Sequence, residues 1–166
     1  MRYKLFIGNL CKLLKSKHKL LLQFIGLLLL CSQSVYAVDI IAHESTLPGY
    51  TDHLTTRELR AIFSLKLKQW PDGLPVTVVT MPNNSELHKS FCREILNVFS
   101  HQLKVGWDRV TYAGLGQPPV VVNSAAEMIS ILRDTPGAIG YIDSDQNIDD
   151  VSIKRIRLDS KRTVQR

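Results

Sequence analysis

Cysteine is scarce in this sequence, and its placement limits what can stabilise the protein. There are three cysteines among the 166 residues, and two of them, Cys11 and Cys31, lie near the start of the chain. If that start is removed, Cys92 remains alone, which excludes an internal disulfide and leaves packing as the source of stability. Cys92 follows His88 by one helical turn, and we expect a packed thiol there rather than a two-residue metal or nucleophile site.

Signatures of catalysis are also missing. Neither G-x-S-x-G nor H-E-x-x-H occurs, and the five histidines are scattered along the chain. His43 adjoins Glu44, but adjacent side chains of a strand point to opposite faces and do not share a metal ion. We therefore expect a non-catalytic protein with no catalytic residues, metal site or cofactor, and a small histidine-dependent hydrolase is the disfavoured alternative.

Acidic residues are absent from residues 1–37, where six of the 21 Lys and Arg residues lie. These six account for the formal charge of +6, so the rest of the chain is neutral and gives no reason to expect nucleic-acid binding. The apolar run at 20–30 is shorter than the roughly 20 residues that span a bilayer, and Val35 and Ala37 suit a cleavage site. We predict a cleaved signal peptide at 1–37 and a periplasmic mature protein, with a membrane anchor as the alternative.

Strands and helices are expected to alternate after residue 37. Apolar and β-branched runs predict strands at 38–42, 76–80 and 120–122. Residues that can cap a helix precede four expected helices, namely Thr55, Ser85, Ser100 and Ser124. The first and last of these have a glutamate three residues later, the spacing of a capping box. This order predicts an α/β fold with a mostly parallel sheet flanked by helices.

The segment TPGAIGY at 135–141 is the most constrained short stretch. Pro136 cannot extend the helix before it, and Gly137 can adopt the positive φ that ends such a helix. A strand is expected from residue 138 onward. Gly140 within that strand indicates a bulge or the close approach of another backbone or a ligand.

A last strand is expected at 151–158, with a change of phase between Ile153 and Ile156. Basic residues dominate from residue 154 onward. We therefore expect one binding-protein-like domain at 38–153, followed by a basic C-terminal edge strand and tail at 154–166.

Taken in order, these segments resemble the phosphate ABC transporter substrate-binding protein family, and most closely its short, single-lobe relatives. The resemblance covers residues 38–142 and rests on the strand at 38–42, LTTRELRAIF at 54–63, WPDGLPVTVV at 70–79, Trp107 and TPGAIGY at 135–141. It implies a single lobe of the type II periplasmic binding-protein fold. Full-length members have two lobes that close on a ligand, and only the second lobe has a counterpart here.

The same resemblance implies an anion site where the strand at 76–80 meets the next helix. In the family that segment contains an arginine and then Ser-Gly-Thr, so that helix amides, hydroxyls and a guanidinium surround the anion. Here only Ser85 matches, because Glu86 and Leu87 replace the glycine and threonine and no arginine precedes them. A carboxylate near the anion works against binding, unless Glu86 points outward in the first helical turn.

The predicted ligand-binding residues are the polar ones that follow two strands. Asn83, Asn84 and Ser85 form a polar helix entrance, and Ser45 and Thr46 follow the first strand on what we expect to be the same edge of the sheet. For each of them a role in turn geometry is the competing interpretation.

Two functions follow from these expectations. The first is an exported, non-catalytic solute-binding-like protein that contacts phosphate or another small oxyanion and works with a membrane transporter or sensor. The alternative is an envelope protein-interaction module that has lost ligand binding.

Overall fold

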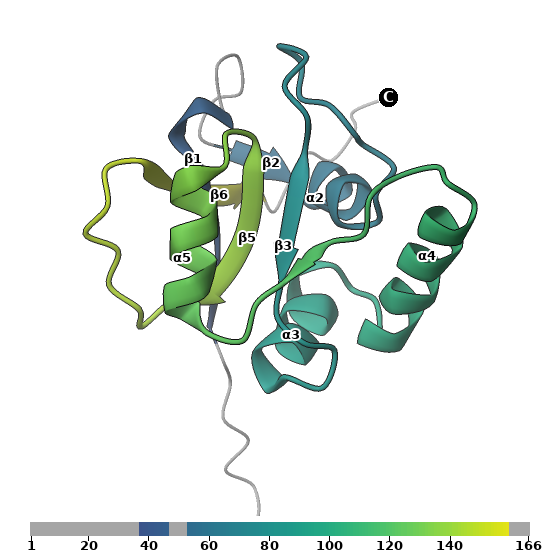
Figure 1. The fold of residues 1–166 in the computed structure, drawn as a ribbon. Helices are drawn as coiled ribbons and strands as arrows, with labels where there is room; N and C mark the ends of the chain where they lie inside the picture. Colours follow the sequence, from purple (N-terminus) through teal and green to yellow (C-terminus); the bar gives the residue numbers. More distant parts are fainter. Residues whose placement is uncertain (1–36, 47–52, 160–166) are drawn as a thin grey trace, which may run out of the picture. The chain divides into compact units, whose positions relative to one another are not determined.

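The computed structural model describes residues 37–46 and 53–159, which form a six-stranded sheet with helices on both faces (Figure 1). The strand order is β2-β6-β1-β5-β3-β4. The strands are β1 (Val38–His43), β2 (His53–Thr55), β3 (Thr77–Thr80), β4 (Val120–Val121), β5 (Ala138–Asp143) and β6 (Ile153–Asp159). The helices are α2 (Thr56–Phe63), α3 (Glu86–Ser90), α4 (Ser100–Tyr112) and α5 (Ala125–Asp134), with a 3-10 turn η1 (Glu44–Thr46) and a π-helical turn η2 (Phe91–Ile95).

Five of the six strands run in one direction, and β1 alone runs the other way. The pairs β2–β6, β3–β5 and β3–β4 are parallel, whereas β1 is antiparallel to both β5 and β6. The expected α/β fold with a mostly parallel, helix-flanked sheet is thus confirmed. None of the described helices is long and apolar enough to cross a bilayer.

The two faces of the sheet are covered by different helices, as the alternating directions of neighbouring residues along β5 show. Gly140 faces α5, because a Cβ added to it would lie 2.5 Å from Met128 Sδ and 3.3 Å from Leu132 Cδ1. Tyr141 points to the opposite face and stacks on Phe91 of η2 with ring centroids 4.0 Å apart. Because both faces are buried, β5 is apolar along nearly its whole length, as expected for a central strand.

The C-terminal strand is not the edge strand predicted from the sequence. β6 pairs with β1 on one side and with β2 on the other, so β2 and β4 are the edges. The sequence did not predict β2, because Leu54 and Thr55 were assigned to the helix at 54–63, whereas Thr55 is both the last residue of β2 and the N-cap of α2. The predicted change in apolar alternation along β6 is confirmed. Ile153 pairs with His43 and Ile156 pairs with Ile40, so the two buried isoleucines are three residues apart and point to opposite faces of the sheet.

Capping explains most of the helix boundaries. Thr55 Oγ1 accepts the Glu58 amide at 3.2 Å, and Glu58 Oε2 accepts the Thr55 amide at 2.8 Å, which confirms the first capping box. Ser124 Oγ accepts the Glu127 amide at 3.1 Å, which confirms the start of α5. The helix expected to be capped by Ser100 has Phe99 at its N-cap position instead. The Phe99 side chain makes no capping hydrogen bond, and Gln102 Oε1 accepts the Phe99 amide at 3.3 Å.

The TPGAIGY segment has the predicted conformation. Gly137 has a φ of 81°. Its carbonyl accepts the Trp70 indole N–H at 3.0 Å and the Thr77 amide at 3.2 Å, so the turn holds the start of β3 against the start of β5. The predicted signal peptide at 1–37 lies outside the described residues except for Ala37, and the tail after Asp159 lies outside them as well.

Candidate functional site

The residues predicted to bind a ligand lie at opposite ends of the strands. β3 and β5 are parallel, so their carboxyl ends lie on the same side of the molecule. Asn83, Asn84 and Ser85 follow the carboxyl end of β3 on that side. β1 is antiparallel to β5, and its carboxyl end therefore lies where β5 begins. The expectation that Ser45 and Thr46 lie at the same strand ends as Ser85 is wrong, because it assumed that β1 runs parallel to its neighbours.

Ser45 and Thr46 make local contacts at their own edge. Ser45 Oγ lies 2.7 Å from His43 Nδ1, and the Ser45 amide donates to the same nitrogen at 3.0 Å. Thr46 is buried, and its hydroxyl donates to the Ala138 carbonyl at 3.5 Å. These contacts close the turn after β1.

The helix entrance after β3 has the predicted form. Ser85 is the N-cap of α3, and its hydroxyl accepts the His88 amide at the long distance of 3.5 Å. Asn84 is exposed. Glu86 points outward and pairs with Lys89 at 2.8 Å, so its carboxylate does not face the entrance.

A buried hydrogen-bond network fixes the backbone that leads into this entrance. Tyr141 Oη accepts the Met81 amide at 2.9 Å and lies 2.6 Å from His88 Nδ1. Thr80 Oγ1 donates to the Met81 carbonyl at 3.1 Å and lies 2.9 Å from Tyr141 Oη. His88 Nε2 lies 3.4 Å from Cys92 Sγ. The network joins β3, β5, α3 and η2 beneath the loop.

Burial sets the protonation state of this network. It lowers the pKa of His88 to about 4 and raises the pKa of Cys92 to about 12, so at neutral pH both groups are uncharged. A neutral His88 that accepts the Tyr141 hydroxyl proton at Nδ1 has its proton on Nε2, directed at the Cys92 sulfur. Cys92 is thus the packed thiol that the sequence predicted. No sequence pattern links Thr80 or Tyr141 to His88, and the network was not predicted.

A pocket of about 310 Å³ opens beside the entrance, between the loop after β3 and helix α4. Met81, Pro82 and Asn83 contribute from the loop, and Val121 contributes from β4. Trp107 and Thr111 line it from α4. Sequence reasoning placed Trp107 in the core, and it is buried, but one part of its ring forms the pocket wall and its indole donates to the Phe63 carbonyl at 2.6 Å.

The polar groups of this pocket are few. Its charged residues, Lys104 and Asp108, pair with each other at 2.6 Å on α4. Asn83 Oδ1 and Thr111 Oγ1 are buried and form no hydrogen bond with any described residue. A buried polar group without a partner costs about 1–3 kcal/mol. The pocket therefore has an apolar wall and a neutralised charge pair, and two of its lining residues carry buried oxygens with unused hydrogen-bonding capacity.

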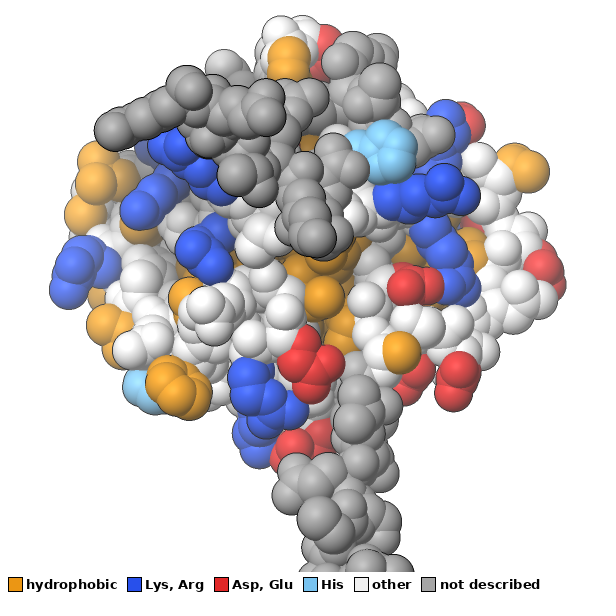
Figure 2. Space-filling view, turned by 180° about the vertical axis from the view of Figure 1, so that it is seen from behind, with side chains coloured by type: hydrophobic (Ala, Val, Ile, Leu, Met, Phe, Trp, Pro, Cys, Tyr) orange, Lys and Arg blue, Asp and Glu red, His pale blue; other side chains and the backbone are white. Residues whose placement is uncertain are grey.

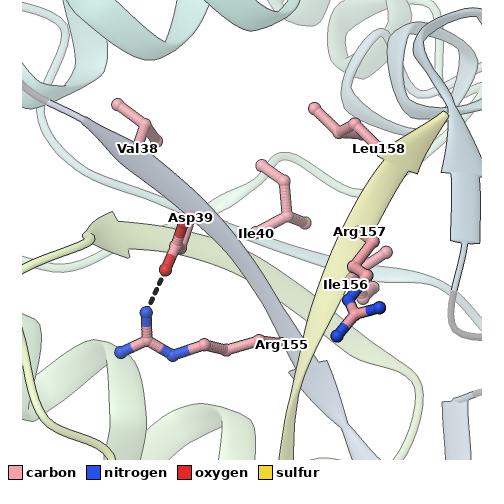
Figure 3. Close-up of a pocket in the computed structure, with 7 residues that line it drawn as sticks. All are labelled: Val38, Asp39, Ile40, Arg155, Ile156, Arg157 and Leu158. Carbon is pink, nitrogen blue, oxygen red and sulfur yellow. Dashed lines mark hydrogen bonds and ion pairs between the residues drawn. The ribbon is translucent and has the colours of Figure 1, made fainter. Parts of the chain in front are cut away.

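A larger, open hollow of about 800 Å³ lies between β1 and β6 (Figure 3). It contains Arg155 and Arg157, the kind of residue that an anion site needs. Arg155, however, forms an ion pair with Asp39 and donates to the carbonyl of Gln146. Its guanidinium therefore joins the loop after β5 to β1. Arg157, the other arginine that lines the hollow, is exposed and forms no ion pair with any described residue.

Exposed apolar side chains gather on the α4 and β4 side of the protein. Among described residues the large exposed hydrophobics all lie in 99–121 apart from Val151. Tyr112 is 89% exposed, Leu115 60% and Val121 55%. On the face drawn in Figure 2, by contrast, Lys and Arg side chains form several separate groups with acidic side chains beside some of them.

The fold is shared with solved substrate-binding proteins. An ABC-type phosphate transport receptor from Vibrio cholerae matches with a TM-score of 0.55 and 20% identity, over 75% of this chain and 46% of its own. A Clostridium perfringens protein described as a phosphate ABC transporter substrate-binding protein with bound phosphate matches with a TM-score of 0.55 and 20% identity, over 73% and 44%. PstS from Borrelia burgdorferi matches with a TM-score of 0.54 and 16% identity, over 75% and 47%.

The chain thus spans less than half of the length of the structures it matches. The family resemblance seen in the sequence is confirmed at the level of fold, because the α/β fold of the described residues matches part of each of these binding proteins. No family model matches the sequence, and no curated protein matches it.

Proposed function

We propose that this chain is an exported, non-catalytic solute-binding-like protein that acts in the periplasm with a membrane transporter or sensor. The observation that supports it most is the pocket at the carboxyl ends of β3 and β4, since open α/β sheets bind ligands outside the carboxyl ends of their strands. The fold shared with proteins of phosphate transport supports the same function.

Phosphate or another small oxyanion is the ligand that the family resemblance suggests. The helix entrance offers the Ser85 hydroxyl, the exposed Asn84 amide and the first amides of α3, and Glu86 faces away from it. Against these stands the lack of any arginine among the residues that line the adjacent pocket. We therefore expect an oxyanion to bind here weakly, in the low millimolar range.

Isothermal titration with phosphate, sulfate and small carboxylates tests this proposal. Ser85→Ala should weaken oxyanion binding, because it removes a hydroxyl donor at the entrance. Ser130→Ala on the exposed side of α5 is the matched control and should leave binding unchanged. If every one of these anions is silent in titration, oxyanion binding by this chain is refuted.

A second candidate function, an envelope protein-interaction module, is favoured by the exposed apolar side chains of residues 99–121. Apolar patches on a small protein often mark binding surfaces for other proteins. A pull-down from expressing cells should recover a partner with the natural protein and lose it with the Tyr112→Ser, Leu115→Ser double variant. Equal recovery by both proteins, or recovery of nothing, argues against a docking role for this surface.

A further inference from the structure

The pocket beside α4 has walls suited to a ligand that is not an anion. Its lining is largely apolar, with Trp107 and Met81 at the buried side and Pro118 and Pro119 on the loop before β4. Ligand pockets commonly combine such walls with a few polar groups that fix orientation. At about 310 Å³ it has room for a small molecule with one ring.

Charge in this pocket is internally compensated. The Lys104 ammonium donates to the Asp108 carboxylate at 2.6 Å, and the remaining lining residues are uncharged. An anion entering the pocket would lose its hydration and gain no free cation in return. A phosphate dianion is therefore poorly matched to these walls.

The unused polar groups are neutral and can complement a neutral partner. Asn83 and Thr111 both line the pocket, and Asn83 Oδ1 and Thr111 Oγ1 make no hydrogen bond with any described residue. Both oxygens are buried from water. They can form hydrogen bonds with a solute only if the Asn83 and Thr111 side chains rotate toward it in the pocket. A hydroxyl or an amide, which can both donate and accept, fits a threonine hydroxyl and an asparagine amide.

From these observations we propose that the pocket between the β3–α3 loop and α4 binds a small neutral solute with an apolar ring and a hydroxyl or amide group. The proposal rests on the solute-binding function above and specifies its ligand class. It assigns specificity to Trp107, Thr111 and Asn83 rather than to Ser85.

The test compares two solutes of the same shape and different charge. Benzamide is a neutral amide on a ring, and benzoate is its anionic counterpart. The chain has two tryptophans, so the two indole N–H resonances of the ¹⁵N-labelled exported protein separate the sites. Trp107 lines the pocket, whereas Trp70 donates to Gly137 at the opposite edge of the sheet.

Benzamide should shift the Trp107 indole resonance saturably at millimolar concentration and leave the Trp70 resonance in place. Benzoate and inorganic phosphate should shift neither. Thr111→Val keeps the shape of the side chain and should weaken benzamide binding about three- to tenfold, the value of one neutral hydrogen bond. Thr77→Val at the start of β3 is the control and should bind as the natural protein does.

The possible failures are distinguishable. If phosphate binds at the entrance and benzamide does not bind, the neutral ligand class is wrong and the solute-binding function stands. If benzoate shifts Trp107 as strongly as benzamide does, or if Thr111→Val has no effect, the proposed recognition is overturned. If no solute binds in either experiment, both proposals fall.

Discussion

Gly137→Ala is the change whose effect the structure specifies most fully. Gly137 has a φ of 81°, and a Cβ there would lie 2.2 Å from the Pro75 carbonyl oxygen and 3.1 Å from the Leu74 side chain. The positive φ costs a residue with a Cβ about 1–2 kcal/mol. The clash is with backbone, so it moves the turn itself and adds about 1–3 kcal/mol. Together they predict a loss of about 2–5 kcal/mol in the free energy of unfolding.

Urea denaturation followed by tryptophan fluorescence measures this loss. Trp70 reports on the same turn, because its indole donates to the Gly137 carbonyl. Gly73→Ala is the matched control, since Gly73 has a φ of 85° and no atom lies within 4 Å of its added Cβ. It should lose only the conformational part, about 1–2 kcal/mol. A Gly137→Ala protein no less stable than Gly73→Ala would refute the steric argument.

Four further changes test the capping box, the buried network and the pocket. Burial lowers the pKa of His88 from an ordinary 6.5 to about 4, so the fold favours the neutral imidazole. The stability is fully present above pH 6.5, and about 3 kcal/mol of unfolding free energy is lost as pH falls from 6.5 to 4. Urea midpoints should therefore fall across this range in the natural protein and change less in His88→Gln. Cys92 is buried and burial raises its pKa to about 12, so alkylation of this thiol at pH 8, followed by mass spectrometry, should be much slower in the folded protein than in the urea-unfolded protein. Thr111→Val removes a buried hydroxyl without a partner and should leave the melting temperature equal or higher. Thr55→Ala breaks the capping box with Glu58 and should lower the unfolding free energy by about 1 kcal/mol in the same urea assay.

Local features of the fold were predictable because they depend on a few neighbouring residues. The capping box at Thr55 and the helix stop at Gly137 follow from side-chain hydrogen bonding and φ preference within one turn. Gly140 was expected to mark a bulge or the close approach of a backbone or ligand, but it lies in a regular strand, and the atoms nearest to an added Cβ belong to the side chains of Met128 and Leu132 in α5. Each of these signals is complete within a short segment.

Strand direction and strand order were harder to predict because they depend on distant pairings. An apolar run such as Val38–His43 indicates burial on both faces and says nothing about direction, so β1 was placed parallel to β3 and its loop on the wrong edge. The basic residues after Ile153 suggested an edge strand, but β6 places them toward solvent along a paired strand. The pocket residues of α4 were missed for the same reason, since only the folded sheet brings them beside Asn83.

The reversed direction of β1 also bears on how the two candidate functions relate. Ser45 and Thr46 lie at the other ends of the strands, so the described residues that a solute in the pocket would meet belong to the end of β3, the β3–α3 loop, α4, the loop before β4 and β4. Tyr112 and Val121 line that pocket and are also among the most exposed apolar side chains. A protein partner that docks on them would lie at the pocket mouth and change the exposure of a bound solute. Solute and partner would then alter each other's affinity by the same factor, since coupling between two sites is reciprocal.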